Sequence, residues 1–187
     1  MNLKLAATGT LVFLLTGCVT PPENVIVANT AVSVTNKTTP ILDTVIEKNK
    51  LSIRSMTLMA NANRINKALS KLNSHVGKTW YVFSGNTPAG WDCSGLTMWF
   101  YEQLGIKLEH RASKQDTAGH ETKDPNPGDI VIFKYKGSND AYHVGIYVGD
   151  GKMIHAPKHG HVTRVEDIST FGGNYSKITY RRIIESI

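Results

Sequence analysis

The chain has 187 residues, of which 41% are hydrophobic and 19% charged, and its formal net charge is +6. This composition is typical of a protein with an ordinary folded core and excludes a largely disordered chain. No apolar run reaches the ~18–20 residues that cross a bilayer as a helix. The two cysteines, Cys18 and Cys93, are too few for a disulfide scaffold or a four-cysteine zinc module.

The first 18 residues have the pattern of an export signal. Lys4 is their single charge, and the apolar run at 11–15 is too short to cross a membrane. The run ends in Leu-Thr-Gly-Cys at 15–18, which resembles a bacterial lipobox. The resemblance implies that a signal peptide at 1–17 is removed and that Cys18 is acylated. An ordinary cleaved signal with a chance cysteine is the alternative.

Residues 18–40 are predicted to form the lipidated N-terminus and a linker. The stretch after Cys18 holds five Thr, three Asn and three Pro but two charges, which favours an extended chain. Alternating valines at 25, 27, 32 and 34 leave a short strand as the alternative. Val19 follows the cysteine in place of Asp. In Gram-negative lipoproteins this implies release to the outer membrane, so the expected location is the periplasmic face of that membrane.

Residues 41–75 are predicted to form a basic helical arm. Apolar residues recur there at helical spacing, first through an earlier stripe and then at 58, 62, 65, 69, 72 and 76. The arm carries six basic and two acidic residues, whereas the chain from residue 76 onward has a net charge of +1. Such an arm fits either contact with anionic lipid or cell-wall polymer, or a solvated helix face. No nucleic-acid motif accompanies the charge, so nucleic acid is not an expected partner. The earlier stripe consists of Leu42, Ile46, Ile53 and Met56.

A different pattern begins at residue 76 and continues to residue 187, which we interpret as one domain. A helix is expected over 92–104, and a turn at 125–128 separates it from short strand-like runs. One helix followed by a meander of strands predicts an α+β fold with a central antiparallel sheet of about five to six strands. The expected strands are 129–134, 142–148, 152–156, 161–165 and 177–184.

Cys93 is the first candidate for chemistry because it opens the expected helix over 92–104. Backbone N–H groups and the dipole at a helix N-terminus favour a thiolate and can also stabilise an oxyanion. If Cys18 is acylated, Cys93 has no disulfide partner, and a lone thiol in an oxidising compartment needs a use. A buried, inert cysteine is the alternative.

Two of the seven histidines, His143 and His155, stand within expected strands. A polar, titratable side chain within a strand indicates a specific role. An imidazole near Cys93 would accept the proton of the Cys93 thiol. Structural histidines are one alternative. A zinc site is the other, formed by Cys93 with these two residues or by His155 with His159 and His161. No short metal-ligand motif supports zinc.

Several motifs together resemble the NlpC-type cell-wall cysteine peptidases. They lie at 81–85, 92–95, 127–133 and 143–149, and the last closes on 154–156. The resemblance covers about residues 65–184. It implies a papain-like fold in which N-terminal helices pack on the sheet. It also implies a peptidase that acts on peptidoglycan stem peptides and needs neither a metal nor another cofactor.

The same resemblance implies a role for individual residues. Cys93 would be the nucleophile, His143 the base, and His155 the residue that orients His143. Tyr81 matches the family tyrosine near the oxyanion. These four residues form the expected catalytic set.

Asp92 and Ser94 match residues that hold the amine end of the substrate. Two stretches depart from the family pattern. Ser84 precedes Gly85 where many members have two glycines, and residues 108–110 read Leu-Glu-His where many members read Leu-Pro-Arg. Gln115 follows the pattern. The departures leave the substrate contacts of these stretches open.

The reaction implied by the resemblance is hydrolysis of a peptide bond next to a D-configured residue. The bond would be γ-D-glutamyl–diaminopimelate, or the D-alanyl–diaminopimelate cross-link. A cell-wall amidase or transferase on the same fold is one alternative, and a non-catalytic wall-binding lipoprotein is another. The expected partners are therefore peptidoglycan stem peptides and, through the lipid anchor, a membrane.

The spacing of the two histidines makes a geometric prediction. Side chains alternate along a strand, so His143 and Gly145 share a face. A three-residue loop at 149–151 would pair Gly145 with His155 and place both imidazoles on that face. A two-residue turn at 150–151 would place His155 on the opposite face. We therefore predict the three-residue loop, with Gly145 leaving room for the His155 ring.

Overall fold

The computed structural model describes residues 40–173 and 176–186. The expected signal peptide at 1–17, the expected acylation site Cys18, and the linker up to residue 39 lie outside the described residues. Within the described part, no helix combines the length and the apolar character needed to cross a bilayer.

Two of the helices are those expected from the sequence. Helix α1 takes up nearly all of the basic arm, and α2 begins at Cys93, directly after its N-cap residue Asp92. Helices α3 and α4 are only four and five residues long, too short to give a helical period in the sequence. The bounds are α1 Pro40–Asn73, α2 Cys93–Glu102, α3 Ala112–Gln115 and α4 Ile168–Gly172.

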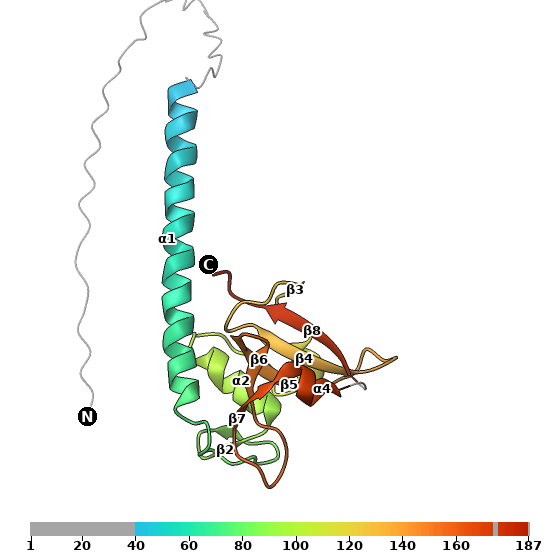
Figure 1. Ribbon diagram of the computed structural model, residues 1–187. Helices are drawn as coiled ribbons and strands as arrows, with labels where there is room; N and C mark the ends of the chain where they lie inside the picture. Colours follow the sequence, from blue (N-terminus) through green and yellow to red (C-terminus); the bar gives the residue numbers. More distant parts are fainter. Residues whose placement is uncertain (1–39, 174–175, 187) are drawn as a thin grey trace, which may run out of the picture. The chain divides into compact units, whose positions relative to one another are not determined.

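Six strands form one antiparallel sheet in the order β3-β8-β4-β5-β6-β7 (Figure 1). The sheet confirms the predicted α+β class, and the five expected strands correspond to β4 to β8. Its strands are β3 His120–Thr122, β4 Ile130–Tyr135, β5 Ala141–Gly149, β6 Lys152–His155, β7 Arg164–Asp167 and β8 Ser176–Arg182. A separate small sheet pairs β1 (Asn86–Thr87) with β2 (Gly90–Trp91).

Strand β7 starts later than the expected strand at 161–165. Residues 161–163 instead pair with the segment before β1, because Tyr81 N–H donates to the His161 carbonyl at 2.9 Å and Gly77 N–H to the Thr163 carbonyl at 2.8 Å. The Trp91 indole N–H also donates to the Thr163 hydroxyl, at 2.6 Å. These contacts hold the segment that carries Tyr81 against the sheet domain.

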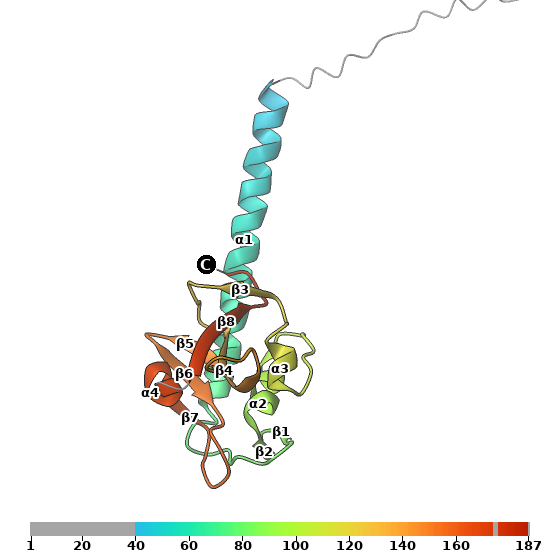
Figure 2. The same ribbon diagram turned by 90° about the vertical axis from the view of Figure 1, so that its right-hand side faces the viewer.

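Strand β4, in the middle of the sheet, is buried on both faces. Ile130 and Ile132 of β4 join a core with α1 and α2, whereas the alternate residues Val131 and Phe133 join a second core with Ile168 of α4. Figure 2 shows α2 and α4 on opposite sides of the central strands. A strand covered on both faces has no polar side to expose, which explains the continuous apolar run in β4.

Helix α1 packs on the domain through its C-terminal half. Ile65, Ala68 and Leu72 are buried in the core that contains α2, and Leu72 has no exposed surface. Every residue from 41 to 57 is exposed. The residues of the earlier apolar stripe are each between 50% and 67% exposed; they are Leu42, Ile46, Ile53 and Met56.

The hairpin between β5 and β6 corrects the predicted loop. Gly149 pairs with Lys152, so the loop has two residues, Asp150 and Gly151, and not three. Both have positive φ angles, 50° and 69°. Two successive positive φ angles are the signature of a type I′ turn, which follows the twist of the strands and favours an Asp-Gly sequence.

The two histidines share a face despite the shorter loop. The register shifts between Tyr147 and Gly149, so Val148 is an extra residue and Ile146 pairs with Ile154. This β-bulge restores the register that a two-residue turn alone would lose. A side chain added at residue 145 would place its Cβ 3.2 Å from the Cβ of His155. The predicted proximity of residues 145 and 155 is therefore confirmed, whereas the predicted three-residue loop at 149–151 was wrong.

Candidate active site

The start of α2 is fixed by Asp92. The carboxylate of this N-cap residue accepts hydrogen bonds from the N–H of Gly95 at 2.8 Å, the N–H of Ser84 at 3.1 Å and the hydroxyl of Ser94 at 2.9 Å. An N-cap of this kind satisfies helix donors that otherwise lack a partner. Cys93 is the first residue of the helix and is half-buried, so these contacts determine where its thiol lies.

Glycine is required at residue 95 because a Cβ there would overlap the carbonyl oxygen of Gly85. Ser84, in turn, has a φ angle of 58°. This left-handed conformation suits glycine better than a residue with a side chain, which accounts for the glycine that many family members have there. The backbone of this turn is thus compatible with the family pattern even though its first residue departs from it.

The pKa of the Cys93 thiol is about 11 as the net result of opposing effects, of which burial, the largest, and the charge of the Asp92 carboxylate raise it. Hydrogen bonds from the backbone N–H groups of Val144, Ser94 and Cys93 itself lower it. The helix N-terminus therefore acts in the expected direction, but desolvation outweighs it. The thiol stays protonated at neutral pH and needs a base. The Val144 hydrogen bond also places the thiol against β5, at the residue that follows His143 in the chain.

His143 of β5 and His155 of β6 form a hydrogen-bonded pair. The Nε2 atom of His143 lies 2.8 Å from Nδ1 of His155, and the two rings meet edge to face with centroids 5.0 Å apart. Burial lowers the pKa of both imidazoles, and the neighbouring His155 lowers that of His143 further. Both rings are therefore neutral at neutral pH, and a neutral His143 is able to accept a proton.

Helix α4 covers the two imidazoles with an aromatic ring. The centroid of Phe171 lies 4.5 Å from that of His143 and 4.6 Å from that of His155. Phe133 of β4 packs against Phe171 at 5.0 Å. This cover keeps water from the imidazoles and is a cause of their lowered pKa values. The short helix gave no signal in the sequence, so Phe171 was not identifiable as a site residue.

Glu166 of β7 is a second residue that the sequence did not reveal. Its Oε2 atom lies 2.9 Å from Nε2 of His155 and 2.8 Å from Nη2 of Arg164. The expected strand ended at residue 165, which left Glu166 outside it. With the observed bounds, alternation places Arg164 and Glu166 on one face of β7, and that signal would have found them.

Tyr81 lies near the thiol. Its pKa is raised, first by burial and then by the charges of Cys93 and Asp92. Both groups must be close to the phenol for their charges to act on it. The phenol stays protonated at neutral pH, so its hydroxyl is available as a hydrogen-bond donor.

The stretch that departs from the family pattern supplies an imidazole to Asp92. The Nε2 atom of His110 lies 2.9 Å from Oδ1 of Asp92, the oxygen that also caps α2. Gln115 is buried, and its amide donates to the carbonyls of Ser94 and Glu109, at 2.9 Å each. The residue that follows the family pattern therefore ties this stretch to α2, and His110 joins the polar group around the N-cap.

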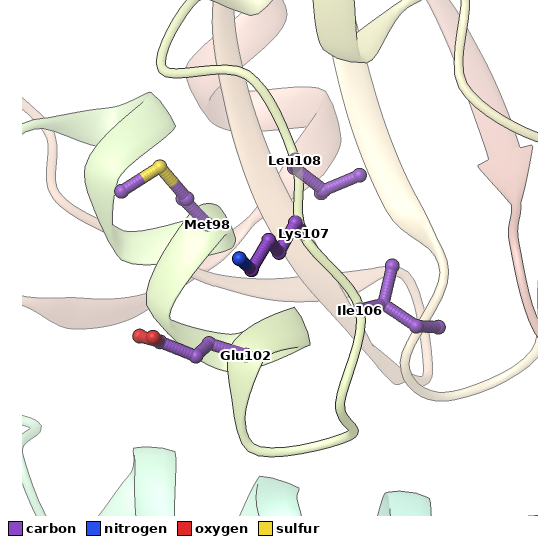
Figure 3. Close-up of a pocket in the computed structure, with 5 residues that line it drawn as sticks. All are labelled: Met98, Glu102, Ile106, Lys107 and Leu108. Carbon is purple, nitrogen blue, oxygen red and sulfur yellow. The ribbon is translucent and has the colours of Figure 1, made fainter. Parts of the chain in front are cut away.

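A pocket of about 200 Å³ lies along α2 and the segment after it (Figure 3). Its lining includes no thiol and no imidazole, so it is not the catalytic centre. The pocket is lined by Met98, Glu102, Ile106, Lys107 and Leu108.

Among residues 40–173 and 176–186, no three His, Cys, Asp or Glu side chains converge as metal ligands, so neither of the two zinc arrangements is formed there.

The chain is similar to curated endopeptidases. It is 36% identical over 108 residues to the murein DD-endopeptidase MepH of Escherichia coli, covering 54% of this chain and 40% of MepH. It is 38% identical over 102 residues to a probable endopeptidase of Mycobacterium tuberculosis, covering 54% of this chain and 26% of the relative. The chain thus spans between about a quarter and two fifths of the length of these relatives.

Solved structures show the same fold. The NlpC/p60 domain of the peptidoglycan hydrolase SagA superposes with a TM-score of 0.53 at 29% identity, covering 62% of this chain and 96% of that one. An NlpC/P60 family protein from Bacillus cereus gives a TM-score of 0.58 at 26% identity, covering 64% and 40% of the two chains. The model of the NlpC/P60 family matches residues 77–184, and the protein belongs to that family.

Proposed function

We propose that the protein is a peptidoglycan hydrolase, a cysteine endopeptidase that cuts stem peptides with the thiol of Cys93. One observation carries the proposal, the 2.8 Å hydrogen bond between His143 and His155, with the thiol of Cys93 at a helix N-terminus hydrogen-bonded to the backbone of Val144, the residue after His143. Nucleophile, base and orienting group in this order are what acyl transfer by a thiol requires. The names of the relatives, which are endopeptidases, support the same reaction class.

The first half of the reaction forms an acyl-enzyme. His143 takes the proton of Cys93 as the sulfur attacks the carbonyl carbon of the amide. The tetrahedral oxyanion accepts hydrogen bonds from the Cys93 N–H and the Tyr81 hydroxyl. The C–N bond then breaks, the leaving amine takes the proton from His143, and the acyl group remains on sulfur as a thioester.

The second half releases the acyl group. His143 takes a proton from water as the water oxygen attacks the thioester, the C–S bond breaks, and His143 then gives that proton to the departing sulfur. The products are a carboxylic acid and the regenerated Cys93 thiol. Because thiol and imidazole are both neutral at rest, the buried site carries an ion pair only while the reaction proceeds. His155 keeps the His143 ring in position throughout.

The proposed bond is γ-D-glutamyl–diaminopimelate within a stem peptide or the D-alanyl–diaminopimelate cross-link between stems. Asp92 and Ser94 are proposed to hold the amine end of the substrate, since a carboxylate with little exposure favours an ammonium group. His110 already contacts that carboxylate at 2.9 Å. An amine that binds Asp92 therefore displaces the imidazole or shares the carboxylate with it.

A digest of purified sacculi tests this function. Wild type and Cys93→Ser are incubated with sacculi, and the fragments are identified by mass spectrometry. New stem-peptide termini produced by wild type and absent with Cys93→Ser support the endopeptidase. Release of free glycan from stem peptides would indicate an amidase, exchange of an added amine into the peptides a transferase, and unchanged sacculi a non-catalytic binder.

We also propose that Cys18 carries a lipid that anchors the protein to a bacterial envelope membrane, at the periplasmic face of the outer membrane. The lipobox resemblance at 15–18 supports this proposal. Cys18→Ala should move the protein into the soluble exported fraction and abolish incorporation of a labelled fatty acid. Membrane retention of Cys18→Ala, together with an unlabelled wild type, would contradict the anchor.

A further inference from the structure

We propose that Glu166, held by Arg164, is a positioning residue that sets the tautomers of both histidines and so makes His143 a base toward Cys93. This inference rests on the proposed function. It starts from a continuous chain of contacts in the described residues. His143 Nε2 lies 2.8 Å from His155 Nδ1, and His155 Nε2 lies 2.9 Å from Glu166 Oε2.

The positions of the protons follow from the chemistry of these groups. A carboxylate only accepts hydrogen bonds, so Nε2 of His155 carries the hydrogen of its contact with Glu166. A neutral imidazole has one N–H, which leaves Nδ1 of His155 as an acceptor. Nε2 of His143 must then be the donor, and Nδ1 of His143 is left bare. That bare nitrogen is the one free to accept a proton from the thiol.

Without the carboxylate, the opposite arrangement is equally allowed. His155 could then donate from Nδ1 to Nε2 of His143. The single ring hydrogen of neutral His143 would then lie on Nδ1. A protonated Nδ1 is unable to accept the proton of the thiol. The carboxylate of Glu166 therefore decides whether Nδ1 of His143 is free to accept a proton or already carries one.

Strand register explains why Glu166 reaches this position. His155 pairs directly with Arg164 across β6 and β7, and Glu166 follows two residues later on the same face. The Glu166 side chain is 21% exposed, and the guanidinium of Arg164 donates to its Oε2 atom from Nε at 2.9 Å and Nη2 at 2.8 Å. These two bonds orient the carboxylate toward His155.

Within residues 40–173 and 176–186, His155 is surrounded by groups from three elements. The groups that face it are His143 from β5, Glu166 and Arg164 from β7, and the uncharged ring of Phe171 from α4. When His143 becomes an imidazolium during the reaction, the negative charge of Glu166 stabilises it through the intervening ring. Such stabilisation is strongest where water is excluded.

The next residue of β7 gives a matched control. Asp167 points to the other side of the strand, is 54% exposed, and pairs with Lys152 at 2.9 Å. Glu166→Gln and Asp167→Asn each replace a carboxylate by its amide at neighbouring positions. Only the first touches the histidine pair.

Steady-state kinetics on a stem peptide test the proposal. Glu166→Gln should lower kcat roughly 10- to 100-fold with little change in KM, because carboxylate-to-amide changes behind a catalytic imidazole act through its tautomer. The acid limb of its kcat/KM profile should move to lower pH, since an anion near the imidazoles is lost. Glu166→Asp should recover part of the rate, and Asp167→Asn should match wild type. Wild-type kinetics in Glu166→Gln would overturn the proposal.

Nitrogen NMR of the imidazoles in the wild-type protein decides the tautomers without reference to activity. The expected spectrum has a protonated Nε2 and a bare Nδ1 in both histidines, and a mixture of tautomers in Glu166→Gln. A protonated Nδ1 in wild-type His155 would overturn the proposal even if the enzyme is active. An inactive wild type with the expected tautomers would instead contradict the proposed function alone.

Discussion

Cys93 and His143 are both uncharged at neutral pH, and this sets the pH dependence of the reaction. Burial raises the pKa of the thiol to about 11 and lowers the pKa of His143 well below its usual 6.5. A base with a lowered pKa keeps its accepting nitrogen as the pH falls. We therefore expect kcat/KM to stay on its plateau at pH 6.5 and to decline only well below it. Initial rates of stem-peptide cleavage across this range measure the limb, and a midpoint at or above 6.5 would contradict the neutral pair.

Gly145 matters because it leaves space beside the histidines. A Cβ at this position would lie 2.8 Å from the sulfur of Met153, 3.2 Å from the Cβ of His155 and 3.2 Å from the carbonyl oxygen of Ile154. Gly145→Ala should destabilise the fold by about 1–3 kcal/mol through overpacking. It should also lower kcat by displacing the His155 ring. Urea unfolding and kinetics on the same preparation test both effects, and a variant identical to wild type in both would show that the site tolerates the methyl group.

At the scale of single elements, α1 offers two leucines in opposite environments. Leu72 is completely buried against the domain, whereas Leu51 is 65% exposed. Leu72→Ala should cost about 2–5 kcal/mol of unfolding free energy, because it leaves a cavity in a packed core. Leu51→Ala should change it by less than about 0.5 kcal/mol. Chemical denaturation of both variants makes the comparison, and equal losses would mean that the N-terminal half of α1 is packed in solution.

The elements that could be predicted from the sequence are those with a strong local signal. The helical period in 41–75, the helix expected over 92–104, and the apolar runs of β4 and β5 each show their type without reference to the rest of the chain. Helix α4 and strand β3 have only five and three residues. Elements of that length form because the domain packs around them, so their sequences carry no period to detect.

The β5–β6 hairpin shows why details at the ends of elements were not predictable. Alternation correctly predicts that His143 and Gly145 share a face, because that rule is local. The choice between a three-residue loop and a two-residue turn with a bulge at Val148 depends on the pairing of both strands. The same limit hid Glu166, since the start of β7 is set by contacts of residues 161–163 with a distant segment.

For the molecule as a whole, the buried histidine pair makes stability depend on pH. Burial lowers the pKa of His155 from 6.5 to about 4. Between these values the unfolded chain binds a proton at this residue that the folded chain does not. Acid therefore favours the unfolded state, by up to about 1.4 kcal/mol per pH unit for each such histidine. The contribution of His155 to the free energy of unfolding is therefore complete above pH 6.5 and is lost as the pH falls toward 4.

Urea titrations at a series of pH values measure this dependence, with His155→Asn as the comparison. The variant lacks the titrating group, so its unfolding free energy should fall less steeply between pH 6.5 and 4. Asp129 acts in the opposite direction, because burial raises the pKa of its carboxyl, and it is present in both proteins. Parallel curves for wild type and variant would contradict a buried, neutral His155.

The central claim is that Cys93 forms a covalent bond to the substrate. Mixing wild type with a synthetic stem peptide, quenching in acid during turnover, and mapping the protein by mass spectrometry tests it directly. We predict that a fraction of the protein carries the acyl half of the peptide as a thioester on Cys93, and that Cys93→Ser cleaves the peptide slower by orders of magnitude. An acyl group on another residue, or cleavage by Cys93→Ser at the wild-type rate, would contradict the claim.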